Sequence, residues 1–172
     1  MKYHGVKMNV NTFSVFNSPI ETGLRSLTLL EAGYPNAYDL ERITYYDYLL
    51  VHSGDIEGGP NSIHPNTPHR SGELLIRRPI IEKGLAVMIS RGLVDIDYSQ
   101  SGIRYIATEL STPFLDSLQA NYTRKMIDTA IWVVEIFDKQ PNQKIRGLIN
   151  KNLQVWGGEF IDESLVRGEN DE

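Results

Sequence analysis

Hydrophobic residues repeat at helical spacing near the start of the chain. The first such stretch opens with Ser18-Pro19-Ile20-Glu21, in which serine suits the N-cap, proline the first helical position and glutamate the reciprocal cap bond. Ile20, Leu24 and Leu27 follow on one face, and Gly33 provides a stop. The pattern predicts a helix with these three apolar side chains in the core.

A second stretch with helical spacing begins at Asp39, which is a favourable N-cap residue. Leu40, Ile43 and Leu50 lie on one side of a helix that reaches about Ser53. We therefore expect two consecutive helices in the first third of the chain.

Residues 54–72 read GDIEGGPNSIHPNTPHRSG and fit no regular element. A loop of this length inside a compact domain is usually functional or else disordered. Its three X-Pro bonds, at Pro60, Pro65 and Pro68, restrict the backbone and favour an ordered loop. We interpret 54–72 as a loop that binds a partner.

The segment after this loop contains Pro79, which decides how it is interpreted. Proline inside a helix costs about 3 kcal/mol, whereas at the first helical position it costs nothing. The sequence therefore predicts a short strand over 73–77 and a helix from Pro79 to Arg91 that ends at Gly92. The apolar stripe of this helix comprises Ile80, Ile81, Leu85, Met88 and Ile89.

Two β-rich runs follow, over 93–98 and 103–108, and a short turn containing Gly102 joins them into a predicted hairpin. Ser111 then caps a further helix, and Asn121 marks a break in it. The helical pattern continues to about residue 138 and is unusually apolar around Ile-Trp-Val-Val at 131–134. This run is either a central packing helix or an interface.

The predicted fold class is α+β and mainly α. The order helix, helix, strand, helix, hairpin, helix is typical of a winged-helix (helix-turn-helix) core, with a two- to three-stranded wing sheet and additional C-terminal helices. We divide the chain into an N-terminal arm at 1–17, a winged-helix-like domain at 18–140 and a C-terminal extension at 141–172, whose last residues we expect to be mobile.

The amino-acid composition indicates the class of protein and the compartment in which it works. Hydrophobic residues make up 41% and charged residues 23% of the chain, which is typical of a globular protein. The absence of cysteine excludes disulfides and thiol chemistry and favours a reducing compartment. The first residues lack the apolar core of a signal peptide, and no run approaches the ~18 apolar residues of a membrane span. We expect a cytoplasmic protein without membrane contact.

A winged helix often binds DNA through its third helix and its wing. The charge of this chain argues against DNA as its ligand. The net charge is −5, so the molecule as a whole is repelled by a phosphate backbone. The possible DNA contacts are Lys83, Arg91 and Arg104, while the wing begins with Asp95 and Asp97. A winged-helix transcriptional regulator is therefore the alternative hypothesis, and we expect DNA to be bound only weakly or indirectly, through a larger complex.

Candidate ligands for a metal gather in and near the loop, but their spacing matches no metal-binding pattern. These residues are His52, Asp55, Glu57, His64 and His69. The glycines at 54–59 are not followed by the Lys-Ser/Thr of a phosphate-binding loop. The sequence thus predicts no catalytic residue, no metal and no cofactor.

Three segments together resemble a known family. NSPIETGLRSLTLLEAGYP, HSGDIEGGPNSIHPNTPHRSGELLIRRPIIEKGLAVM and the GLV-plus-hairpin that follows are similar to the middle component of bacterial ABC-three-component systems, a group that includes Lamassu-type defence. The resemblance covers most of residues 16–138, and its most distinctive part is HPNTPHRSGELLIRR.

The resemblance implies a non-enzymatic adaptor subunit. Such a subunit would bridge an SMC-like ABC ATPase and a variable effector, often a nuclease, in defence against phages or plasmids. No catalytic residue follows from it. We expect the partners to be bound by the loop, by the charged residues after it and by a second apolar region, with these contact residues: His64, Pro65, His69, Arg70, Glu73, Arg77, Arg78, Trp132 and Trp156.

Overall fold

The computed structural model describes residues 17–64 and 73–153. Its regular elements are, in chain order, α2 (Pro19–Ala32), β1 (Tyr38–Asp39), α3 (Leu40–Val51), a 3-10 turn (Ser53–Asp55), α4 (Glu73–Ser90), β2 (Val94–Ser99), β3 (Gly102–Ala107), α5 (Ser111–Asp116) and α6 (Asn121–Phe137). A final helix follows over 142–153. The α+β, mainly helical fold class predicted from the sequence is confirmed.

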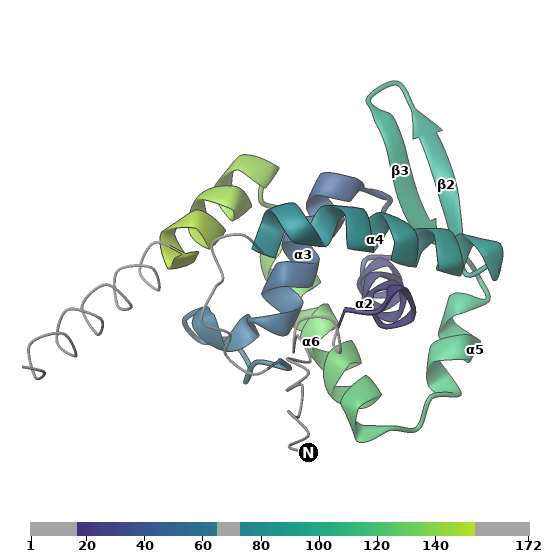
Figure 1. The fold of residues 1–172 in the computed structure, drawn as a ribbon, viewed down its shortest axis with the longest axis horizontal. Helices are drawn as coiled ribbons and strands as arrows, with labels where there is room; N and C mark the ends of the chain where they lie inside the picture. Colours follow the sequence, from purple (N-terminus) through teal and green to yellow (C-terminus); the bar gives the residue numbers. More distant parts are fainter. Residues whose placement is uncertain (1–16, 65–72, 154–172) are drawn as a thin grey trace, which may run out of the picture.

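The helices form one packed body from which the hairpin extends (Figure 1). α4 lies across α2 and α3, and α6 packs against both of the latter. Ten of the twelve residues of α3 are buried, so this helix is enclosed on nearly all sides and not on the single face that its pattern predicted. In the extension predicted from residue 141, Ile145 and Ile149 of the last helix are fully buried against the same core.

The sheet has three antiparallel strands in the order β1-β3-β2. β2 and β3 form the predicted hairpin, with Ile96 opposite Tyr105 and a positive φ of 122° at Gly102 in the turn. The third strand is β1, where Tyr38 pairs with Tyr105. The prediction of the third strand at 73–77 is therefore wrong. β1 has only two residues, too few to show the alternation by which strands are recognised.

α4 starts at Glu73, six residues before the predicted start at Pro79, which lies inside the helix. Two features offset the proline. The carbonyl that loses its donor belongs to Leu75, and this residue is 84% exposed, so water can reach it. In addition, Glu73 and Arg77 are both buried, and helical spacing places them on one side, where they form an ion pair at 3.2 Å.

The predicted start signals of the first two helices are confirmed. The Ser18 hydroxyl accepts a hydrogen bond from the Glu21 amide at 3.2 Å, and the Asp39 carboxylate accepts one from the Arg42 amide at 2.7 Å. The predicted core face of α2 is only partly correct. Leu27 is fully buried and Leu24 is partly buried against the core, but Ile20 is 64% exposed.

α2 and α4 cross with their backbones almost in contact. A Cβ atom added to Gly84 would lie 2.6 Å from the Gly23 nitrogen, and one added to Gly23 would lie 2.7 Å from the Gly84 carbonyl oxygen. Only glycine fits at such a crossing. The close approach brings polar side chains of both helices within reach of α3.

Among the described residues, no helix is both long and apolar enough to cross a membrane.

Candidate functional site

Asp47 of α3 joins three helices through one carboxylate. It is fully buried, and its Oδ1 and Oδ2 accept hydrogen bonds from Nε and Nη2 of Arg25 on α2, at 2.6 Å and 3.2 Å. Arg77 of α4 donates from Nη1 to the same Oδ2. The bidentate pair with Arg25 and the bond to Arg77 fix the relative positions of α2, α3 and α4.

The contacts continue along α4. Nη2 of Arg77 donates to Oε2 of Glu73 at 3.2 Å, and the same oxygen lies 2.7 Å from Nε2 of His52. We refer to Arg25, Asp47, His52, Glu73 and Arg77 as the buried ionic network. Its two arginines face two carboxylates, which is the arrangement that makes charge tolerable in a protein interior.

The electrostatics of the network keep Asp47 ionised. Burial alone raises the pKa of this carboxyl, but the charges of Arg25 and Arg77 and their hydrogen bonds lower it to about 2. Burial lowers the pKa of Arg25, because it disfavours the charged form of this group too. The charge and hydrogen bonds of Asp47 more than reverse this effect, so the pKa of Arg25 is raised above its ordinary value. Both groups therefore remain charged at neutral pH.

Three residues of the predicted interface lie in or beside this network. His64, Glu73 and Arg77 were expected to touch a partner, yet all three are buried in the described structure. Their polar atoms face other groups of the same chain, because the first turns of α4 pack against α2 and α3. Sequence reasoning missed Arg25 and Asp47. A signal was present, since Arg25 is the only charged residue in 22–30 and Asp47 is the only one in 43–51.

His64 lies beside this network in a neutral state. Its Nε2 is 3.4 Å from the Tyr122 hydroxyl and 3.9 Å from Oε1 of Glu21. Burial, followed by the positive charge of Arg25, lowers the pKa of His64 from 6.5 to about 3. The folded protein therefore excludes a proton that the unfolded chain accepts.

This difference predicts a pH dependence of stability. Between pH 6.5 and about 3 the unfolded chain binds a proton at His64 that the native state does not, so stability falls as pH falls, by about 1.4 kcal/mol per unit. Urea unfolding of the wild type and of His64→Gln measures this slope. The measurements are made at pH 7, 6, 5.5 and 5, about the range in which histidine is the only side chain that titrates. We expect the slope to be shallower in His64→Gln, and parallel profiles would contradict the assignment.

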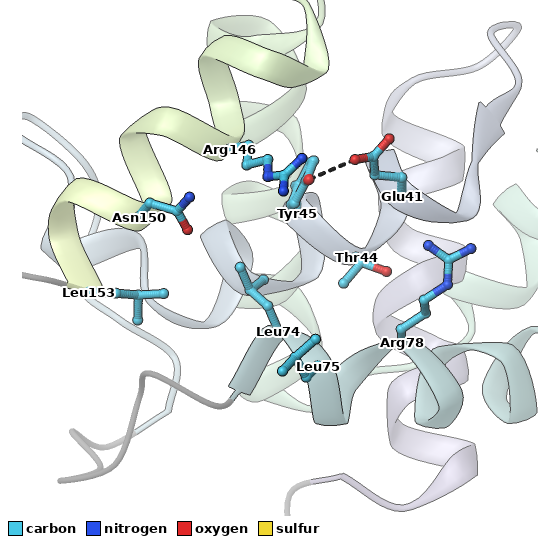
Figure 2. A pocket seen from close by; sticks show the side chains of 9 residues that line it. All are labelled: Glu41, Thr44, Tyr45, Leu74, Leu75, Arg78, Arg146, Asn150 and Leu153. Atoms are coloured by element: carbon cyan, nitrogen blue, oxygen red, sulfur yellow. Dashed lines mark hydrogen bonds between the residues drawn. The ribbon is translucent and has the colours of Figure 1, made fainter.

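A groove opens beside the N-terminal end of α4, between α3, α4 and the helix over 142–153 (Figure 2). Its volume is about 370 Å³, and we call it the basic groove. The Glu41 carboxylate in its wall accepts hydrogen bonds from the Tyr45 hydroxyl at 2.7 Å and from Asn142 at 3.2 Å. The lining residues are Glu41, Thr44, Tyr45, Leu74, Leu75, Arg78, Arg146, Asn150 and Leu153.

A second hollow, of about 550 Å³, lies just beyond the C-terminal end of α4. Two carboxylates, Asp95 and Glu109, line it, together with Tyr34 and Leu110, whose side chains are 54% and 58% exposed. We call it the acidic hollow. Gly92, Ile106, Ala107 and Thr108 complete the lining.

The remaining predicted contact residues occupy different places. Arg78 lines the basic groove. Trp132 is half-buried and packs edge-on against Phe137, with ring centroids 6.0 Å apart. The other four predicted residues lie outside the described part of the chain: Pro65, His69, Arg70 and Trp156.

The three predicted DNA contacts, Lys83, Arg91 and Arg104, lie on different elements. Lys83 and Arg91 are exposed on and just after α4. Arg104 on the hairpin donates to Asp97 at 2.6 Å, so its charge is already paired. Within residues 17–64 and 73–153, no group of three or more His, Asp or Glu side chains could hold a metal ion.

Comparison with known proteins assigns the chain to a protein family. The sequence model described as ABC-three component (ABC-3C) system Middle Component 2 matches residues 15–159. No curated protein and no solved structure matches the chain. The match spans the helices that carry the buried ionic network, the basic groove and the acidic hollow, so the chain belongs to the middle component 2 family of ABC-three-component systems.

Proposed function

We propose that this chain is the non-enzymatic adaptor subunit that joins an SMC-like ABC ATPase to an effector, often a nuclease, in a Lamassu-type system. The complex would act in the cytoplasm against phages or plasmids. Membership of a middle component family supports this proposal, since a component of a multi-part system requires protein partners.

The observation that carries the proposal is the placement of two unlike hollows at the two ends of α4. Leu74, Leu75 and Arg78 of the first turns line the basic groove, and Gly92, just after the last turn, lines the acidic hollow. A helix of 18 residues is about 27 Å long at 1.5 Å per residue. Two partners of opposite charge could therefore bind without competing for the same surface.

We further propose that the core is a winged helix. The order α2, β1, α3, α4, β2, β3 supports this assignment, with the hairpin as the wing and α4 in the position of a recognition helix. The charges favour protein over DNA as the ligand. On α4, Lys83 follows Glu82 directly, and the cation of the wing, Arg104, is paired with Asp97.

The bridging role is testable with three proteins. The ATPase encoded beside this chain is tagged and captured in the presence of the effector, with and without the chain. We expect the effector to be recovered only when the chain is present. Recovery of the effector without the chain would exclude bridging.

The same preparation addresses the alternative. A transcriptional regulator would shift its own promoter fragment in a gel at about 50 mM salt, with steep salt dependence. We expect no shift from the isolated chain.

A further inference from the structure

Three leucines line the basic groove, and one of them is largely exposed to solvent. Leu74 and Leu75 reach it from α4 and Leu153 from the helix over 142–153 (Figure 2). Leu75 is the most exposed of the large hydrophobic side chains in the described residues. An apolar side chain left in water inside a hollow is a common feature of binding surfaces.

The rim of the groove is positively charged. Arg78 and Arg146 have no ion-pair partner among residues 17–64 and 73–153, whereas Arg25, Arg77 and Arg104 each have one. Glu41 offsets one of these two charges, so the residues that line the groove keep a net charge of +1. The helix over 142–153 adds Lys144 and Lys151 and contains no acidic residue.

The walls of the groove are held in place before any ligand arrives. Arg78 follows directly after Arg77, which is fixed in the buried ionic network. The bond from Asn142 to Glu41 attaches the last helix to α3. Burial, together with the bond to Glu41, raises the pKa of Tyr45 to about 12, so this hydroxyl keeps its proton and its bond. A preformed site loses little entropy on binding.

We infer that the basic groove binds an acidic, leucine-bearing segment of a protein partner. The three leucines would contact leucine-type side chains of the partner, and Arg78 and Arg146 would pair with carboxylates on either side of them. A nucleic acid is a poorer match, because three leucines offer its phosphates nothing and the net charge of the chain is −5. This inference rests on the proposed adaptor function and names the chemistry of one of its contacts.

Overlapping short peptides that tile the adjacent ATPase and effector provide the probe, with fluorescence anisotropy as the readout. We expect the tightest peptides to combine Asp or Glu with Leu. We expect Arg78→Glu with Arg146→Glu to weaken them at least about tenfold. Lys83→Glu with Arg124→Glu changes the net charge equally at exposed residues outside the groove lining, and it should leave binding within about twofold of the wild type.

We call the protein with Arg78→Glu and Arg146→Glu the groove variant, and we use a labelled DNA duplex as a second probe. Three results would overturn the inference: no peptide binds, the groove variant binds the peptides as the wild type does, or the groove variant loses only the binding of the DNA duplex. Failure of the groove and failure of the adaptor function are distinguishable. If the groove variant still bridges ATPase and effector, the groove assignment is wrong and the adaptor function stands. If the wild-type chain does not bridge them, the adaptor function itself is wrong.

Discussion

Asp47→Asn is expected to cost the protein about 3–5 kcal/mol of stability, because removing one partner of a buried ion pair leaves the other charge uncompensated. Here the loss is shared by two arginines, Arg25 and Arg77, both buried and both bonded to this carboxylate. A domain of this size has about 5–15 kcal/mol in total, so urea unfolding should show a large fall in the midpoint.

The matched control is Asp97→Asn. Asp97 also pairs with an arginine at 2.6 Å, but both side chains of that pair are 40% exposed. Water and salt screen such pairs, so we expect a change well below 1 kcal/mol. Equal effects of the two substitutions would show that the network does not hold α2, α3 and α4 together.

Gly84→Ala is expected to destabilise the protein by about 3 kcal/mol, through overpacking where α2 crosses α4. The added methyl group would meet the backbone nitrogen of Gly23 at 2.6 Å, and backbone cannot move aside as a flexible side chain can. Thermal or urea unfolding measures the change.

Gly147→Ala provides a control of opposite sign. This glycine lies in the helix over 142–153, and a Cβ atom there would meet nothing within 4 Å. Alanine is a better helix former than glycine, so we expect a gain of about 0.5–1 kcal/mol. A loss of similar size in both variants would point to a general effect of the substitution and against the close crossing.

Local signals in the sequence were sufficient where the structure depends on neighbouring residues. The caps at Ser18 and Asp39 and the turn at Gly102 act within three residues, and the sequence predicts all of them. The start of α4 was not predictable in this way. Pro79 gives a local penalty of about 3 kcal/mol, but Glu73 and Arg77 contact residues 21 to 30 positions away, and such contacts leave no periodic trace.

The candidate site was predictable to a similar degree. Arg78 was expected to contact a partner, and it lines a groove. Its counterpart Arg146 comes from the extension after residue 140, which carries no recognisable motif, and only folding brings the two side chains to one rim. For His64, Glu73 and Arg77 the sequence does not indicate burial, because charge in a distinctive motif is typical of an exposed interface. In the structure all three side chains are buried.

The central claim is that the two ends of α4 serve two partners. The most direct measurement repeats the capture of ATPase and effector with two variants, Arg78→Glu with Arg146→Glu in the basic groove and Asp95→Lys with Glu109→Lys in the acidic hollow. The account predicts that each variant loses one partner and retains the other. The account is contradicted if both variants lose the same partner. It is also contradicted if each variant still binds both partners.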